Sequence, residues 1–270
     1  MEITFNLNDG LWYFIYQHLA KETGGIQPWQ FLLLTSAFVI ISIVAGYLLG
    51  SINSAIIVSR IFYNDDIRRH GSGNAGLTNI LRTYGKGAAG FTLLGDFLKT
   101  AIAVAIGGIL GGFGYFGGIS IGGIPQGTFP LTYIAGLFSI IGHVYPIFYK
   151  FKGGKGVLCT AVMALILNPI EFAILLALFI IMLVISKYVS LASVTVAVLY
   201  PVVVNGHIAI IKGFMETPPA TGILLFITVI IAIMIVYMHR ENLKRISNGT
   251  ERRFSIGHKE KREDSSEEHS

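Results

Sequence analysis

A short polar run lies between two apolar stretches of this chain, and its residue types are those that bind phosphate. The run extends from Gly71 to Arg82 and contains three glycines, two asparagines, a serine and a threonine. Glycines allow turns that bring successive N–H groups toward an anion, and a guanidinium matches phosphate geometry. The run therefore predicts a phosphate-binding loop. A dinucleotide site is excluded, because an apolar helix rather than a strand precedes the glycines.

A second polar segment, residues 142–156, carries three lysines interspersed with glycines. It offers cations and backbone N–H groups together, as a phosphate site requires. It is not a Walker loop, because Tyr149 stands where that motif needs glycine and Gly156 where it needs serine or threonine. An ordinary basic loop is the alternative, but its Gly-Gly-Lys-Gly run favours a binding function.

A third polar segment, residues 239–251, continues the last apolar stretch. His239 and Asn242 are three positions apart, so on a continuous helix they share one face. A capped helix end with Gly249 as its stop would explain the basic residues of this segment, but not His239 or Asn242. These two side chains are therefore candidates for chemistry.

Two charged residues, Asp96 and Lys99, lie inside an apolar stretch and are also three positions apart. A charge within a membrane costs about 2.5–3.5 kcal/mol on insertion scales, and a mutual ion pair lowers that cost. The pair either joins helices or belongs to a functional site.

The composition is that of an integral membrane protein. Of the 270 residues, 53% are hydrophobic and only 13% are charged, whereas soluble domains carry roughly 25% charged residues. The single cysteine, Cys159, excludes an intrachain disulfide and a cysteine metal cluster, and its apolar surroundings predict a buried side chain. The net charge of +5 falls in short loops and the tail, so it does not indicate a nucleic-acid partner.

The chain predicts an all-α integral membrane protein with about seven transmembrane helices. All but three of the 20 lysines and arginines lie on one side of these spans. The rich side is expected to be cytoplasmic, which places the N-terminus outside and the C-terminus inside. The fourth stretch is short, and a re-entrant hairpin with the fifth is the alternative. The expected spans are 31–60, 85–110, 130–148, 156–168, 170–186, 189–211 and 221–239.

Three regions are expected along the chain. Residues 1–30 form an N-terminal extension whose aromatic stretch, 11–16, is too short to span and is expected at the membrane interface. Residues 31–251 form the seven-helix membrane domain. Residues 252–270 form a charged tail that is expected to be disordered.

Four ordered motifs resemble those of the bacterial acyl-phosphate:glycerol-3-phosphate acyltransferases, the PlsY family. They are Gly-Ser-Gly-Asn-x-Gly-x-Thr-Asn-x-x-Arg, Leu-Gly-Asp-x-x-Lys, Gly-His-x-x-Pro-x-Phe-x-x-Phe-Lys-Gly-Gly-Lys-Gly-Val and His-x-x-Asn-x-x-Arg-x-x-x-Gly-x-Glu. The resemblance covers roughly Gly46 to Glu251. The chain departs from the family in its longer N-terminus, its charged tail and Tyr145, where phenylalanine is usual.

The resemblance implies a monomeric, multi-pass enzyme of the bacterial plasma membrane whose active site faces the cytoplasm and needs no metal or cofactor. It would transfer a fatty acyl group from acyl phosphate to the 1-hydroxyl of glycerol 3-phosphate, giving lysophosphatidic acid and inorganic phosphate. The implied catalytic residues are Ser72, Arg82, Lys155, His239 and Asn242. The implied substrate-binding residues are Gly71, Gly73, Asn74, Gly76, Thr78, Asn79, Asp96, Lys99, His143, Lys152, Gly153, Gly154, Ser190, Ser193, Arg245 and Glu251; which of the two serines contributes stays open.

The chemistry of the residues agrees with this reading. Acyl phosphate is already an activated anhydride, so no covalent nucleophile is required. His239 is the natural base for the attacking hydroxyl, with Asp96 or a substrate phosphate oxygen as alternatives. Acyltransferases with a His-x-x-x-x-Asp pair are disfavoured, because none of the seven histidines has an aspartate five residues on. A membrane transporter of a phosphorylated small molecule remains the alternative function.

Overall fold

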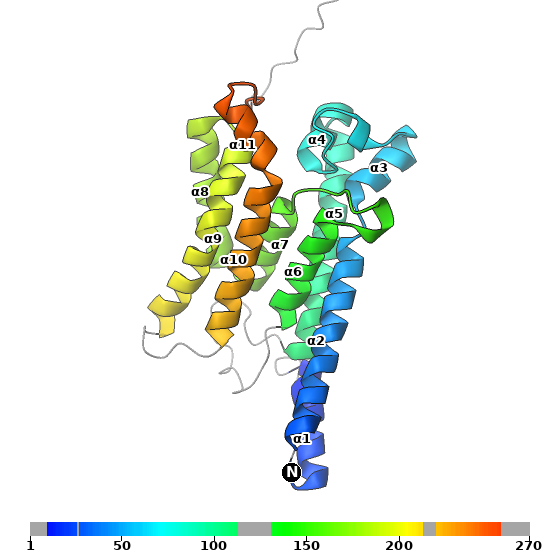
Figure 1. Cartoon of the computed structure of the whole chain (residues 1–270), viewed down its shortest axis with the longest axis vertical. Helices are drawn as coiled ribbons and strands as arrows, with labels where there is room; N and C mark the ends of the chain where they lie inside the picture. Colours follow the sequence, from blue (N-terminus) through cyan, green and yellow to red (C-terminus); the bar gives the residue numbers. More distant parts are fainter. Residues whose placement is uncertain (1–9, 26, 113–130, 213–219, 255–270) are drawn as a thin grey trace, which may run out of the picture.

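The computed structural model describes residues 10–25, 27–112, 131–212 and 220–254, and every regular element among them is a helix. Figure 1 shows most of the long helices running side by side along the longest axis of the molecule. The α-helices are α1 Gly10–Thr23, α2 Pro28–Gly50, α3 Ser54–Tyr63, α4 Leu77–Tyr84, α5 Lys86–Gly111, α6 Leu131–Val144, α7 Val157–Leu167, α8 Pro169–Ser186, α9 Val189–Lys212, α10 Ala220–Met238 and α11 Arg240–Ser247; the 3-10 helices are η1 Ile67–Arg69 and η2 Ile147–Tyr149.

The expected all-helical membrane fold is confirmed, but helix length supports fewer spans than seven. In the described ranges five stretches are long and apolar enough to cross a membrane, and six if the bent pair α10–α11 is counted as one. The difference is α7, which has 11 residues. At 1.5 Å per residue it is about 16 Å long, roughly half of a bilayer core.

The short α7 ends at a tight junction with α8. Asn168 lies between the two helices, and its side-chain oxygen accepts hydrogen bonds from the N–H groups of Ile170 and Glu171. Pro169 occupies the first position of α8, where its missing N–H costs nothing. A single residue therefore separates the end of α7 from the start of α8.

The first expected stretch begins earlier and contains a break. Helix α2 starts at Pro28, and the helical run is interrupted after Gly50 before Asn53 caps α3 through its side chain. Helix α2 packs closely on α6 because small residues lie at their contact. A Cβ on Gly142 would approach the backbone nitrogen of Ser51 to 2.8 Å, so only glycine allows this separation of the two backbones.

The polar segments of the chain gather at one end of the bundle. Figure 1 shows α3, α4 and α11 at that end and α1 at the opposite end. Aromatic residues 11–16 belong to α1, where Trp12 is buried and donates a hydrogen bond to Thr35 Oγ1 at 3.1 Å. Residues 255–270 of the expected tail, residues 1–9 of the extension, and segments 113–130 and 213–219 lie outside the described residues.

Candidate active site

A cavity of about 790 Å³ opens at this polar end and extends down between α7, α8, α9 and α10. Most of the site residues expected from the sequence line it, although they come from segments as much as 180 positions apart. The lining set includes Gly71, Ser72, Asn74, Gly76, Thr78, Asn79, Arg82, Asp96, His143, Lys155, Ser190, Ser193, His239, Asn242, Arg245 and Glu251. Five expected residues do not line it: Gly73, Lys99, Lys152, Gly153 and Gly154.

The glycine-rich run forms a loop that is organised by Asn79. The Asn79 side-chain nitrogen lies 2.9 Å from the carbonyl of His70 and 3.1 Å from that of Asn74, while Oδ1 accepts the Ser72 N–H at 3.2 Å. Asn79 is buried, so its amide groups hold the loop rather than a ligand. Gly71 takes a φ of +57° in this loop, which favours glycine.

The expectation that the whole run presents N–H groups to an anion is wrong in detail. The N–H groups of Ser72, Gly73 and Gly76 donate to acceptors inside the loop. The start of α4, at Leu77 and Thr78, also borders the cavity. First-turn N–H groups of a helix have no acceptor within that helix, so this end suits an anion.

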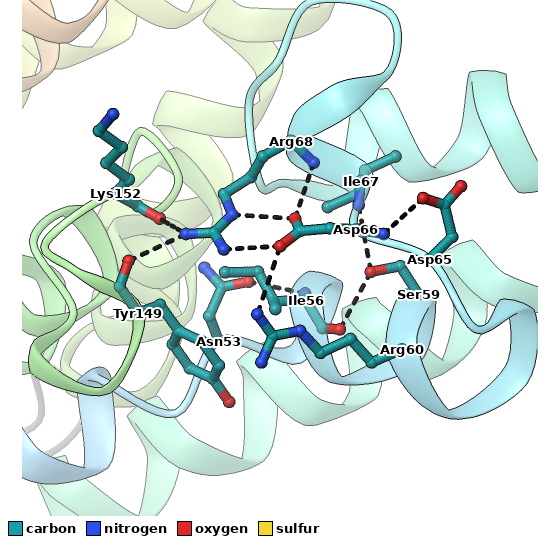
Figure 2. Close-up of polar contacts among 10 residues, drawn as sticks. All are labelled: Asn53, Ile56, Ser59, Arg60, Asp65, Asp66, Ile67, Arg68, Tyr149 and Lys152. Atoms are coloured by element: carbon teal, nitrogen blue, oxygen red, sulfur yellow. Dashed lines mark hydrogen bonds and ion pairs between the residues drawn. The ribbon is translucent and has the colours of Figure 1, made fainter.

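Arg68, which the sequence analysis did not single out, connects the glycine-rich loop to the second polar segment. Figure 2 shows its guanidinium held by the Asp66 carboxylate on one side and by the carbonyls of Tyr149 and Lys152 on the other. The Nη1 atom lies 2.9 Å from the Tyr149 oxygen and 3.4 Å from the Lys152 oxygen. One side chain thus fixes the spacing of two loops.

In the second segment, only one of the three lysines lines the cavity. Lys152 is exposed and lies outside the cavity, whereas Lys155 lines it. The N–H groups of Gly153 and Gly154, expected to face a phosphate, donate to the carbonyls of Val144 and His143 at 3.2 and 3.0 Å. The glycines therefore cap the end of α6, and of the three lysines only Lys155 reaches the cavity.

Lys155 belongs to a polar network that centres on Glu251. Lys155 Nζ donates to Asn242 Oδ1, and Asn242 Nδ2 donates to Glu251 Oε1 at 2.6 Å. Ser190 Oγ reaches the same carboxylate oxygen at 2.9 Å, and Arg245 Nε lies 2.8 Å from the other. Burial opposes ionisation of Glu251, but these hydrogen bonds outweigh it and hold its pKa below the usual range. Glu251 therefore positions other site residues.

His239 stands at a bend of 51° between α10 and α11, so the last helix does not continue straight as the sequence suggested. His239 Nδ1 lies 2.8 Å from the carbonyl oxygen of Ile235. A carbonyl only accepts hydrogen bonds, so Nδ1 carries the proton and Nε2 carries the lone pair of the neutral ring. The Nε2 lone pair makes this atom available to accept a proton.

The expected pair of Asp96 and Lys99 is a buried cluster that includes His143. Lys99 Nζ lies 2.8 Å from Asp96 Oδ1, 2.8 Å from His143 Nδ1 and 2.9 Å from the carbonyl of Ile52. The contacts with Ile52 and His143 are hydrogen bonds, and the contact with Asp96 is an ion pair. Lys99 therefore orients Asp96 and His143, which line the cavity, and does not itself reach it.

Two pairs of like charges face the mouth of the cavity. Burial, and then the neighbouring Arg252, lower the pKa of Arg82. Burial, and then Arg245, lower the pKa of Lys155 to about 8. The negative charge of Glu251 partly offsets this by raising the pKa of both cations. Like charges held together in this way are stabilised when an anion binds between them.

The inner half of the cavity is mainly apolar and was not anticipated in detail. Helices α7, α8 and α9 line it with aliphatic and aromatic side chains, which suit an extended hydrocarbon. Arg252, Thr250 and Tyr200 also line the cavity, and no motif in the sequence pointed to them. In the described part of the chain, no group of three His, Cys, Asp or Glu side chains is placed to hold a metal ion.

A family model described as glycerol-3-phosphate acyltransferase matches residues 40–249. The chain belongs to this family. The glycerol-3-phosphate acyltransferase of Syntrophomonas wolfei is 38% identical over 213 residues, which cover 79% of this chain and 95% of that relative. The Bacillus subtilis glycerol-3-phosphate acyltransferase is 36% identical over 209 residues, 77% of this chain and 94% of the relative. The resemblance seen in the motifs is thus confirmed.

Two solved structures of this family have the same arrangement of helices. Both are crystal structures of PlsY (YgiH), an integral membrane glycerol 3-phosphate acyltransferase. The glycerol 3-phosphate form superposes with a TM-score of 0.64 at 29% identity, covering 80% of this chain and 96% of that one. The lysophosphatidic acid form gives 0.61 at 28% identity, covering 80% and 95%.

Proposed function

We propose that this member of the glycerol-3-phosphate acyltransferase family transfers a fatty acyl group from acyl phosphate to the 1-hydroxyl of glycerol 3-phosphate. The products are lysophosphatidic acid and inorganic phosphate. The observation that carries the proposal is a single cavity with cations at its mouth and an apolar inner half. Such a cavity fits a reaction that joins a phosphorylated polyol to a hydrocarbon chain.

The two like-charge pairs support two phosphate positions in this cavity. The cations Arg82 and Arg252 form one pair, and Lys155 and Arg245 form the other. The reaction brings two phosphates together, one on each substrate, and each requires counter-charge. Holding both substrates at attack distance supplies catalysis without a covalent intermediate.

The reaction proceeds by direct attack. The 1-hydroxyl oxygen of glycerol 3-phosphate bonds to the acyl carbonyl carbon, and the bond from that carbon to the phosphate oxygen breaks. The hydroxyl proton passes to Nε2 of His239, which holds a lone pair because Nδ1 donates to Ile235. A phosphate anion bound beside Lys155 offsets the charge of that lysine and so favours proton transfer to the neighbouring ring.

An acyl transfer assay tests the proposal. Purified full-length protein is given glycerol 3-phosphate with either palmitoyl phosphate or palmitoyl-CoA, and lysophosphatidic acid is measured by mass spectrometry. We expect product with the acyl phosphate and none above background with the thioester. An equal rate with palmitoyl-CoA would contradict the proposed donor.

The proposal includes an active site that faces the bacterial cytoplasm, because the polar end of the bundle carries the positive charges. In a Cys159→Ala background, single cysteines at Asn248 and at Glu22 report the two ends of the molecule. Both positions are exposed, and neither lines the cavity. We expect an impermeant maleimide to label Glu22→Cys in intact cells and Asn248→Cys only after lysis. The reverse pattern would contradict the orientation.

A further inference from the structure

The apolar half of the cavity is bordered by three helices, and each contributes an innermost lining residue. On α7 the lining residues run from Val157 to Ala164, a rise of about 10 Å. On α8 the innermost lining residue is Phe172, and on α9 it is Tyr200. Ala164 and Tyr200 belong to one buried apolar cluster, and Phe172 packs against it. The groove therefore has a defined floor.

Beyond this floor lies a buried polar cluster that the proposed reaction does not use. Asn168 Nδ2 donates to Glu171 Oε1 at 2.8 Å, and His207 Nδ1 lies 3.0 Å from the same oxygen. Asn168 and Glu171 are 7% and 3% exposed. Asn168 precedes Phe172 by four positions, about one helical turn, and His207 follows Tyr200 by seven positions, about two turns.

A hydrocarbon chain that entered this cluster would separate polar groups that have no water to replace their partners. Leaving a buried polar group unpaired costs more free energy than the burial of one further methylene gains. The cluster thus excludes a chain that is longer than the groove. The junction at Asn168, where the short α7 ends, sets the position of this barrier.

We infer that Tyr200 and Phe172, backed by the Asn168–Glu171–His207 cluster, set the maximum length of the acyl chain that the enzyme accepts. The inference rests on the proposed function, since it assigns the apolar half of the cavity to the acyl donor. Tyr200 is fully buried and Phe172 is half-buried. Removal of either ring opens room at the floor for further methylenes.

The test is a competition among lauroyl, myristoyl, palmitoyl, stearoyl and arachidoyl phosphates, with the lysophosphatidic acids resolved by mass spectrometry. The wild-type protein should show a sharp fall in kcat/KM beyond one chain length. In Tyr200→Ala and in Phe172→Ala the fall should move to a chain two methylenes longer. For each protein, kcat/KM for that longer chain is divided by kcat/KM for the longest chain that the wild type accepts. This ratio should rise roughly tenfold in the variants.

Two controls accompany these variants. Tyr200→Phe keeps the ring and should keep the wild-type limit. Ile174→Ala removes an exposed α8 side chain that does not line the cavity and should also keep it. Phe172→Ala serves if Tyr200→Ala does not fold. An unchanged limit in every folded floor variant, with wild-type product formed, would overturn this inference alone. No product from any acyl phosphate with the wild-type protein would overturn the proposed function as well.

Discussion

Arg68 meets Asp66 through a two-point contact, with Nε 2.9 Å from Oδ1 and Nη2 2.6 Å from Oδ2. Hydrogen bonds from Arg68 hold the pKa of Asp66 far below its usual range, so the pair is ionised at any working pH. The third guanidinium nitrogen, Nη1, donates to the carbonyls of Tyr149 and Lys152. The two loops beside the cavity are therefore joined by one arginine that does not line it.

Arg68→Ala is expected to lower kcat/KM at least tenfold, mainly through kcat, because the loops that position the substrates separate. A hydrogen bond to a charged group contributes about 1.5–3 kcal/mol. Arg68→Lys should recover only part of the loss, since an ammonium cannot make the two-point contact. Steady-state kinetics with varied glycerol 3-phosphate measures the split between kcat and KM.

The matched control for this prediction is Arg60→Ala. Arg60 is half-exposed, and its Nη2 lies 3.3 Å from Asp66 Oδ2, farther than the Arg68 nitrogens. Exposed ion pairs of this kind contribute little to stability. Its variant should stay within about threefold of the wild type. Wild-type kcat in Arg68→Ala would show that the loops keep their spacing without the arginine.

Lys155→Ala and Arg82→Ala are each expected to reduce kcat/KM by about tenfold to a hundredfold, since each removes a cation from the cavity mouth. The chain supplies a close control in Lys152, three residues from Lys155 in the same loop but exposed and outside the cavity. Lys152→Ala should remain near the wild type. Equal losses in Lys152→Ala and Lys155→Ala would mean that general basicity, rather than a positioned cation, supports the reaction.

Much of this site could be predicted from the sequence because of where the polar residues lie. Arg82, Lys155, His239 and Asn242 all flank apolar stretches on the lysine- and arginine-rich side, so one membrane face must gather them. Local spacing then indicated their chemistry. These residues do line one cavity.

The remaining features depend on contacts between distant segments, which spacing along the chain does not encode. Arg68 bonds to carbonyls more than 80 positions away. Their place in a lysine- and glycine-rich run predicts that Gly153 and Gly154 bind phosphate, but their N–H groups donate to carbonyls at the end of α6. The 51° bend at His239 is equally invisible, because no proline or glycine marks it.

Glu251→Gln is expected to lower kcat/KM at least tenfold although Glu251 is acidic and lies in a site for anions. Its two carboxylate oxygens accept hydrogen bonds from Asn242, Ser190 and Arg245. The amide of glutamine has only one acceptor oxygen for these three donors. Glu241→Gln, an exposed acid on α11, is the matched control and should have little effect. A rise in activity in Glu251→Gln would indicate instead that the negative charge only repels substrate.

His239→Ala should lower kcat more than it raises KM if the imidazole accepts the hydroxyl proton. Cys159→Ala should keep near-wild-type activity, because Cys159 is fully buried and direct attack needs no nucleophile. Incubation of the protein with acyl phosphate alone, followed by intact-mass spectrometry, should detect no acyl adduct. A stable acyl-protein that transfers its chain to glycerol 3-phosphate would overturn direct attack.

The pH dependence of kcat/KM should report Lys155. Its pKa is lowered to about 8 by burial and by Arg245, so the free enzyme loses this charge as the pH rises through that value. Binding of glycerol 3-phosphate should weaken on the same limb, because the deprotonated amine no longer attracts phosphate. Lys155→Arg keeps its charge above pH 8 and should move the fall in kcat/KM to higher pH, while Lys152→Arg should leave the profile in place. An unshifted limb in an active Lys155→Arg would assign the titration to a different group.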